Sequence, residues 1–214
     1  MNTEIKKIAL ASAITLLAGM ASADPLSWTE AGVGYNVADS VNEDATAIDI
    51  RGGIGFAGMG HAQLTYADGS VDVIGGSDID FDGYEARAGV HPSVGDKTQL
   101  VVDAIYFDYS GDQGSYNVDE DGWGLGFGLR HQLGDQFEIR AQIDYVDGSW
   151  DDNDGDSGDF KNTTYSFGGR YYWVPNFFTG VGVTISGSEA FSVVDEGGDV
   201  IRVDAGWSFG GDVL

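Results

Sequence analysis

The sequence contains no cysteine, and it has only three prolines and ten basic residues among its 214 residues. Without cysteine the fold gains no disulfide and must depend on strand pairing and packing. The 35 acidic residues outnumber the basic ones and give a net charge of −25. That charge argues against nucleic acid or an anionic membrane surface as a partner.

Long apolar stretches are also missing beyond residue 23. None approaches the roughly 18 residues that a membrane-spanning helix needs, so such a helix is excluded there. A membrane barrel is not excluded, because its strands give a much weaker hydropathy signal than helices do.

The first 23 residues have the order of a secretory signal peptide. Lys6 and Lys7 are followed by a short apolar stretch over residues 8–17 and by the small residues Ala21-Ser22-Ala23, a typical cleavage site. A buried N-terminal helix would not explain this order. We therefore expect the mature chain to begin at Asp24 and to form one domain over residues 24–214, with 8 basic and 34 acidic residues.

The mature chain alternates apolar and polar residues with a period of two. Ile48, Ile50 and Ile54, for example, alternate with Asp49 and Arg51. This is the period of a β-strand, whose successive side chains point to opposite faces. Segment 100–107 is ambiguous, because both of its faces carry large apolar residues. The predicted strands are 29–36, 48–56, 62–66, 84–90, 100–107, 123–130, 137–145, 165–173, 177–185 and 201–209.

The connections between these strands are short on one side and long on the other. Residues 58–60, 133–135 and 174–176 are tight turns and 91–97 is somewhat longer, whereas the long connections are 38–45, 68–82, 110–121, 147–160 and 187–199. Bacterial outer-membrane barrels have this layout. The predicted fold class is therefore all-β: a closed antiparallel up-and-down transmembrane β-barrel of about ten strands, with eight as the alternative and both termini on the short-turn side.

The six arginines of the chain all fall on the polar faces of predicted strands. The planar guanidinium suits paired, enclosed carboxylates, and neighbouring glycines leave room for it in a narrow lumen. We expect a lumen ion network made of Asp49, Arg51, Glu85, Arg87, Arg130, Glu138, Arg140, Asp144, Arg170, Arg202 and Asp204.

Aromatic residues on the apolar faces gather near the strand ends, with aliphatic residues between them. A soluble, lipocalin-like barrel would place its apolar face inside, and aromatics filling its core would show no such clustering. Two girdles around an aliphatic band indicate a wall that faces lipid. The predicted girdle residues are Tyr35, Tyr66, Tyr84, Trp123, Tyr145, Trp173, Phe177, Trp207 and Phe209.

The alternating pattern, closed by a strand with Trp207 and Phe209, resembles the small outer-membrane β-barrel proteins of Gram-negative bacteria, the OmpA-like transmembrane and opacity-type group. The likeness covers the mature chain as a pattern, without a specific motif. Such proteins usually end on an aromatic residue, whereas this chain continues through residues 210–214. The resemblance implies a location in the Gram-negative outer membrane, contacts with its lipid and lipopolysaccharide, and folding by the outer-membrane insertion machinery; we further expect a monomer.

Catalysis is not expected. Barrel enzymes of this membrane generally use a histidine at the outer rim or in the bilayer-facing wall, but His61, His91 and His131 lie at or near the short turns. A lone histidine there is more often structural or solvated. We expect a non-enzymatic barrel with a structural or surface-interaction role and a largely filled lumen. The alternatives are a small passive pore for ions or small solutes and, more weakly, a lipid-modifying barrel enzyme.

The predicted long connections carry 22 acidic residues and no lysine or arginine. They form a solvated negative coat or, as the sharper alternative, bind divalent cations such as Ca²⁺ through hard oxygen ligands. Asp152, Asp154 and Asp156 come closest to a calcium loop, but Trp150 stands at its first ligand position. We therefore expect no cofactor, with Ca²⁺ at these three residues as the weaker alternative.

Overall fold

The computed structural model describes residues 26–39, 43–73, 78–186 and 199–209, so the expected signal peptide at 1–23 lies outside the described residues. They form ten antiparallel strands, and β1 pairs with β10 to close the barrel. The predicted ten-stranded barrel is thereby confirmed over the eight-stranded alternative. The strands are β1 (Thr29–Asp39), β2 (Glu43–Phe56), β3 (Gly60–Val73), β4 (Ile79–Val90), β5 (Thr98–Gln113), β6 (Tyr116–Leu133), β7 (Phe137–Asp152), β8 (Ser157–Val174), β9 (Phe177–Ser186) and β10 (Asp199–Phe209).

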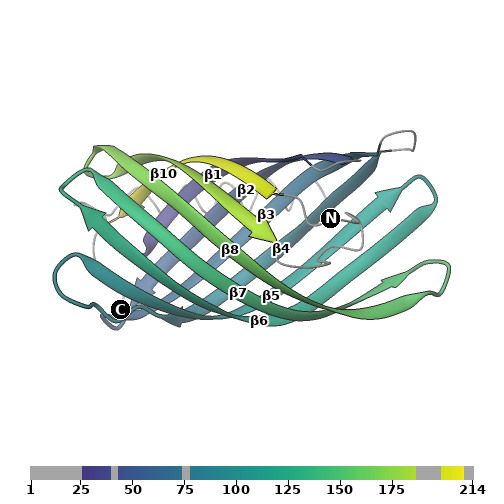
Figure 1. Ribbon diagram of the computed structural model, residues 1–214, viewed down its shortest axis with the longest axis horizontal. Helices are drawn as coiled ribbons and strands as arrows, with labels where there is room; N and C mark the ends of the chain where they lie inside the picture. The colour runs from purple at the N-terminus through teal and green to yellow at the C-terminus, as the bar shows by residue number, and fades with distance from the viewer. Residues whose placement is uncertain (1–25, 40–42, 74–77, 187–198, 210–214) are drawn as a thin grey trace.

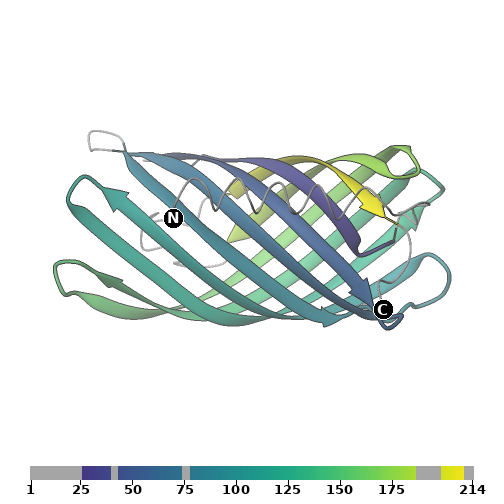
Figure 2. The same ribbon diagram turned by 180° about the vertical axis from the view of Figure 1, so that it is seen from behind.

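The strands are strongly tilted and surround one lumen, as the two opposite views show (Figures 1 and 2). Such a tilt is what closure of a sheet into a barrel requires. Within the part of the chain that the structure describes, no helix is long and apolar enough to cross a membrane.

One end of the barrel carries tight turns. Gly58 and Gly134 lie in them with φ of 74° and 71°, a conformation that glycine adopts without a Cβ clash. Thr29 pairs with Phe209, so β1 starts and β10 ends at this same end. At the opposite end the hairpins run on well past the exposed apolar residues, as the extracellular hairpins of bacterial barrels do, so that end is the extracellular one.

The strands run much further toward the extracellular end than the sequence analysis predicted. β3 and β4 cover most of 68–82, β5 and β6 meet at a turn over 114–115, and β7 and β8 meet at a turn over 153–156. The prediction of long connections at 68–82, 110–121 and 147–160 is therefore wrong. Connections 38–45 and 187–199 lie partly outside the described residues, and their described parts belong to strands.

The reason for this error is a reversal of polarity along each strand. Up to the level of Tyr66, Tyr84, Trp123 and Tyr145 the outward face is apolar; beyond that level it is acidic. On β6, Asp119 and Asp121 are exposed whereas Val118 is buried. The alternation continues along the strand, but the apolar residues change from the outer to the inner face. A prediction that follows one apolar face therefore ends the strand too early. We call the lower part of the barrel the membrane section and the part beyond these four aromatics the extracellular section.

The two faces of β5, ambiguous in the sequence, are distinct in the structure. Val101, Ile105 and Phe107 are buried in the lumen, while Leu100 and Val102 are exposed on the outer face. Asp103 shares the inward face and reaches His61 on β3. The lumen therefore holds apolar side chains as well as charged ones.

Candidate functional site

The outer face of the membrane section carries exposed aliphatic side chains. Ile48 and Leu125 are 56% and 53% exposed, and Leu64 and Val203 are similarly uncovered. A contiguous apolar band of this kind is unfavourable in water and is accommodated by the hydrocarbon core of a bilayer. This face is therefore the lipid-facing one, and the soluble-barrel alternative is wrong for this part of the barrel.

The extracellular border of the band is an aromatic girdle of Tyr35, Tyr66, Tyr84, Trp123 and Tyr145 on the outer face. The Tyr66 hydroxyl donates to Asp82 at 2.8 Å, and that of Tyr84 donates to Asp108 at 3.0 Å. The rings lie against the apolar band and the hydroxyls reach the acidic layer above it. Amphipathic rings adopt this arrangement where a membrane wall meets water.

The periplasmic girdle consists of Trp173, Phe177 and Trp207, and the rings of Phe177 and Trp207 lie 5.0 Å apart. Phe209 does not add to this exposed girdle, because it is only 7% exposed. The Ser27 hydroxyl donates to the carbonyl of Phe209, so the segment before β1 lies against the end of β10. For Phe209 the prediction of a lipid-facing position is wrong.

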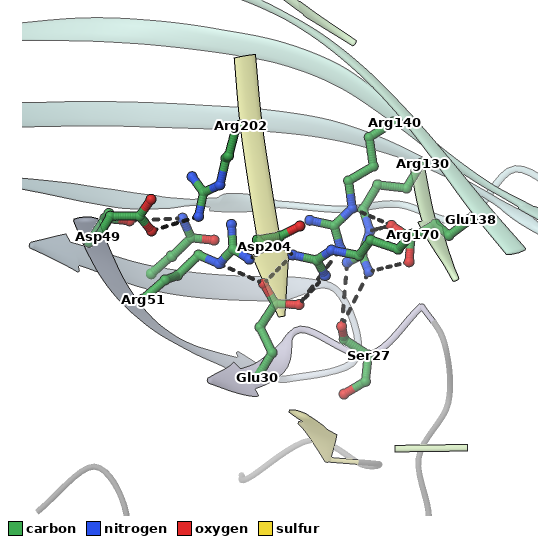
Figure 3. A network of polar contacts seen from close by, with 12 residues as sticks. Ser27, Glu30, Asp49, Arg51, Arg130, Glu138, Arg140, Arg170, Arg202 and Asp204 are labelled. Carbon is green, nitrogen blue, oxygen red and sulfur yellow. Dashed lines mark hydrogen bonds and ion pairs between the residues drawn. The ribbon is translucent and has the colours of Figure 1, made fainter. Parts of the chain in front are cut away.

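Every residue of the predicted lumen network lies on an inward strand face, and Figure 3 shows most of them converging from different strands. The deepest of them, Glu138, is completely buried, and Arg130 and Arg170 are nearly so. Charges this far from water are tolerated only when they are paired and hydrogen-bonded. The contacts below supply those partners.

Glu30, which the sequence analysis left out of the network, lies at its centre. Its carboxylate accepts hydrogen bonds of 2.6 and 3.2 Å from Arg170, and it lies 3.3 Å from Arg51 and 3.6 Å from Arg140. Only 3% of Glu30 is exposed. Its place on the polar face of β1, beside Gly32 and Gly34, is the signal that could have identified it.

Arg51 and Arg202 each have an aspartate two residues away on their own strand, but each pairs with the aspartate of the other strand. Arg51 of β2 reaches Asp204 of β10 at 2.6 Å, and Arg202 of β10 reaches Asp49 of β2 at 2.6 Å. Both pairs cross β1, which lies between these strands and carries glycine there: a Cβ on Gly34 would come within 2.8 Å of the Arg202 guanidinium. The glycines of β1 therefore allow the exchange.

Arg140 and Arg87, in contrast, contact the glutamate that stands two residues away on their own strand. Arg140 contacts Glu138, and Glu138 also accepts hydrogen bonds of 2.9 Å from Arg130 and from the Tyr172 hydroxyl. Arg87 lies 2.6 Å from Glu85.

Arg87 also crosses the lumen to Asp144 on β7, at 2.9 Å. Asp144 in turn accepts a hydrogen bond of 2.8 Å from Gln142. The barrel walls are thus tied together by charged contacts in two places, one centred on Glu30 and one on Arg87.

At the periplasmic end of the lumen lies Trp28, which precedes β1. Its ring stacks on His61 with centroids 3.7 Å apart and an interplanar angle of 19°, and it also stacks on His91 at 5.2 Å. The Arg130 guanidinium lies 4.6 Å from the ring centroid, and the indole N–H donates to Gln99 at 3.1 Å. Trp28 is therefore held from several sides as a plug.

Above Trp28 the network borders a polar cavity of about 460 Å³. Arg87, Arg140 and Arg202 reach its surface, with Glu85 and Asp144 on other parts of the wall. Each of these charges already has an oppositely charged partner, and at about 30 Å³ per water molecule the cavity has room for several waters between the ion pairs. This arrangement can hold water or a small polar solute.

The three histidines lie at the periplasmic end, as expected. His61 is fully buried with its Nε2 2.7 Å from Asp103, and His91 is buried with its Nε2 3.1 Å from the carbonyl oxygen of Gly60. His131 on β6 has its Nδ1 2.8 Å from the Thr98 hydroxyl. Each ring has a role in packing or hydrogen bonding at the barrel end.

The weak calcium candidate lies at the hairpin between β7 and β8. Asp152 Oδ1 accepts backbone N–H groups of Asp154 and Asp156, at 3.0 and 2.8 Å, and Oδ2 accepts the Tyr116 hydroxyl at 2.9 Å. Burial alone would raise the pKa of Asp152, but these hydrogen bonds outweigh it and lower the pKa. Among the residues that the structure describes, no group of three His, Cys, Asp or Glu side chains could hold a metal ion. The Asp152 carboxylate serves the turn itself.

One known structure shares this fold, and two others are similar to it over most of the chain. The translocator domain of the autotransporter NalP from Neisseria meningitidis aligns over 96% of this chain and 96% of its own, with 12% identity and a TM-score of 0.56. The NanC porin aligns over 84% of this chain and 99% of its own, with 9% identity and a TM-score of 0.48. The KdgM porin covers the same shares at 13% identity and a TM-score of 0.43. At these identities the likeness concerns the fold alone.

Comparison of sequences gives the family. No curated protein matches the chain. The model of a family described as a domain of unknown function, DUF7840, matches residues 1–165. With its closed barrel, lipid-facing wall and aromatic girdles, the protein is an outer-membrane β-barrel of a Gram-negative cell, and the chain belongs to the DUF7840 family.

Proposed function

We propose that this barrel is non-enzymatic, does not conduct, and has a structural or surface-interaction role, in line with the OmpA-like and opacity-type group that its sequence resembles. The observation that carries the proposal is the contact chain across the lumen, in which Glu30 joins Arg170 and Arg51, and Arg51 joins Asp204. Below this chain, Trp28 fills the periplasmic end. A path for solutes would have to break several buried ion pairs, each of which costs several kcal/mol to separate.

The outside of the molecule suits such a role. The exposed acidic residues of the extracellular section, among them Asp72, Asp119 and Asp151, give the cell surface a negative collar. We further propose that the barrel is a monomer whose partners are outer-membrane lipid, lipopolysaccharide and, during assembly, the insertion machinery.

Conductance in planar lipid bilayers tests this proposal. We expect the wild-type barrel to show no discrete openings, and Trp28→Ala combined with Glu30→Gln to create them by removing the plug and the central carboxylate. Leu125→Ala, on the lipid-facing wall, is the matched control and stays silent. A gel shift between boiled and unboiled samples shows that each variant is folded.

A small passive pore is the second candidate, because the polar cavity of about 460 Å³ lies directly above the plug. This candidate predicts discrete openings of the wild-type barrel whose size changes in Arg140→Ala. Such openings would refute the non-conducting barrel.

A further inference from the structure

A recess in the wall of the polar cavity lies between Arg140 of β7 and Arg202 of β10. Arg140 pairs with Gly168 of β8, and Arg202 pairs with Gly182 of β9. Gly168 and Gly182 pair with each other, and all four residues line the cavity. Neighbouring strands lie about 4.8 Å apart, so the two arginines begin about 14 Å from each other, with two glycines between them.

The space over these two glycines is not filled by neighbouring side chains. A Cβ on Gly168 or on Gly182 would first meet a backbone carbonyl oxygen of the adjacent strand, at 2.9 and 3.1 Å. At Gly34 and Gly180, in contrast, a Cβ would strike aspartate side chains of the ion network. Gly168 and Gly182 therefore leave a hollow in the inner wall, where a ligand can come close to the backbone.

Arg140 has no carboxylate of its own among the described residues. Its guanidinium contacts Glu138 through Nε and lies 3.6 Å from Glu30 through Nη2. Glu138 is also bound by Arg130, and Glu30 is also bound by Arg170. The Nη2 atom is buried and has no hydrogen-bond partner. Arg140 therefore keeps donor capacity that its shared partners do not use.

Arg202 is in a similar position at the other end of the recess. It donates one hydrogen bond of 2.6 Å to Asp49, and its Nε has no hydrogen-bond partner. The side chains of Arg140 and Arg202 are 25% and 29% exposed, whereas those of Glu138 and Asp49 are 0% and 3% exposed. The two guanidinium groups thus reach the cavity, while the carboxylates that contact them are covered; Figure 3 shows both arginines with these partners.

A pair of hydroxyl groups borders the recess on its extracellular side. Ser166 of β8 and Thr184 of β9 are paired in register and line the cavity, and their oxygens lie 2.8 Å apart. In such a pair one hydroxyl donates to the other, whose own O–H is left to donate elsewhere. The recess therefore offers a neutral donor between two positively charged ones.

Acidic residues on other parts of the cavity wall limit the charge of a ligand. Glu85 accepts Arg87 at 2.6 and 2.9 Å, and Asp144 accepts the same guanidinium at 2.9 Å. One arginine thus serves two carboxylates, and this part of the wall keeps a negative excess that repels anions. A singly charged anion is therefore favoured over a doubly charged one.

We propose that the recess binds a small carboxylate with a single negative charge. Its two oxygens accept N–H groups of Arg140 and Arg202 and the O–H of the Ser166–Thr184 pair, since the planar guanidinium fork matches a carboxylate. This inference goes beyond the proposed function and holds whether or not the barrel conducts. The recess lies on the wall formed by β7 to β10, whereas conductance depends on a path past Trp28, so a titration and a conductance measurement fail independently.

An NMR titration of the full barrel in lipid nanodiscs tests the proposal with acetate and its neutral isostere acetamide, at constant ionic strength set with sodium chloride. We expect acetate to shift the backbone amide signals of Gly168 and Gly182 in a saturable way, and acetamide to leave them in place. Gly114 and Gly134, which lie in turns at opposite ends of the barrel, report non-specific effects of the salt and should not follow the same curve.

Two variants remove donors from the recess. Arg140→Gln should weaken acetate binding by about tenfold or more, because a charged donor is lost. Glu138 and Glu30 keep Arg130 and Arg170 in this variant, so no buried carboxylate is left without a partner. Thr184→Val removes a hydroxyl at nearly constant volume and should weaken binding by about threefold; it also tests the recess if Arg140→Gln fails to fold.

Lys161→Gln is the matched control, because it removes a positive charge from the outer face of β8, where Lys161 is 64% exposed and pairs with Asp147. It should leave the acetate titration unchanged. The proposal is overturned if acetate causes no saturable shift or if acetamide binds as tightly as acetate. It is also overturned if folded Arg140→Gln and Thr184→Val bind acetate like the wild type, or if Lys161→Gln weakens binding as much as they do.

Discussion

The membrane section and the extracellular section are built from the same strands, yet their faces are exchanged. On β6, Leu125 and Phe127 point outward in the membrane section and Arg130 points inward. Further along the same strand, Asp119 points outward and Val118 inward. The backbone geometry is continuous across the change, because β6 keeps its pairing register with β5 and β7. The medium outside the wall, lipid below and water above, selects which residue type suits each face.

The interior follows the same exchange. In the membrane section the outer face is apolar, and the polar side chains pair with each other inside. In the extracellular section water solvates the outer face, and the inside becomes a small apolar core. One barrel thus combines the plan of a membrane barrel with that of a soluble barrel, in which the apolar face is inside.

The largest effect is expected from breaking the interior of the membrane section. Glu30→Ala removes the carboxylate shared by Arg170, Arg51 and Arg140 and should lower the free energy of unfolding by about 3–5 kcal/mol, because buried guanidinium groups lose their partner. Urea unfolding in lipid vesicles, followed by tryptophan fluorescence, measures it. Asp119→Ala, an acid on the outer face of the extracellular section, should change stability by less than about 0.5 kcal/mol. Equal effects would contradict the comparison.

The outer wall should distinguish the two sections nearly as strongly. Phe127→Arg places a charge further into the lipid-facing band, away from the girdle at Trp123, and should cost about 2–4 kcal/mol. Asp121→Arg, on the same face of β6 but in the extracellular section, should be close to neutral, because the position is solvated. The same unfolding measurement compares them, and a comparable loss in Asp121→Arg would show that this level of the wall lies within the bilayer.

A smaller effect is expected inside the extracellular section. Val71→Ala removes buried methyl groups from the apolar interior of the extracellular section and should reduce the free energy of unfolding by about 1 kcal/mol. Its neighbour Asp72 points outward, so Asp72→Ala serves as the control and should have little effect. If Val71→Ala and Asp72→Ala changed the free energy of unfolding equally, the packing of Val71 inside the barrel would contribute nothing to stability.

The smallest effect concerns the β7–β8 hairpin and depends on pH. Because the folded hairpin lowers the pKa of Asp152, its stabilisation is present above the ordinary pKa of an aspartate and is lost as pH falls through the lowered value. After correction for the intrinsic pH dependence of amide exchange, the exchange of the Asp154 and Asp156 N–H groups should accelerate over that acidic range. Asp152→Asn should remove this step while leaving global unfolding unchanged; a step that persists in the variant would assign it to another carboxylate.

Much of the candidate site was predictable from local pattern. The two-residue period places Arg51, Arg87 and Arg130 on the polar faces of their strands. Because a charged side chain is not stable against lipid, these faces must point into the lumen. Their exact partners were not predictable where the pairing is long-range. Arg51 and Asp204 are 153 residues apart, and they meet because β1 closes the barrel between β2 and β10.

The sequence by itself determined the strand period, a barrel of about ten strands and the polar lumen, because one-residue alternation and the position of each arginine are local properties of the chain. The tertiary structure decided the rest. Closure brought Glu30 to the centre of the network and exchanged the partners of Arg51 and Arg202. The structure also shows that the acidic segments continue as strands. Clustered aspartates predict loops from the sequence alone, but they are stable on a strand face that is exposed to water above the membrane.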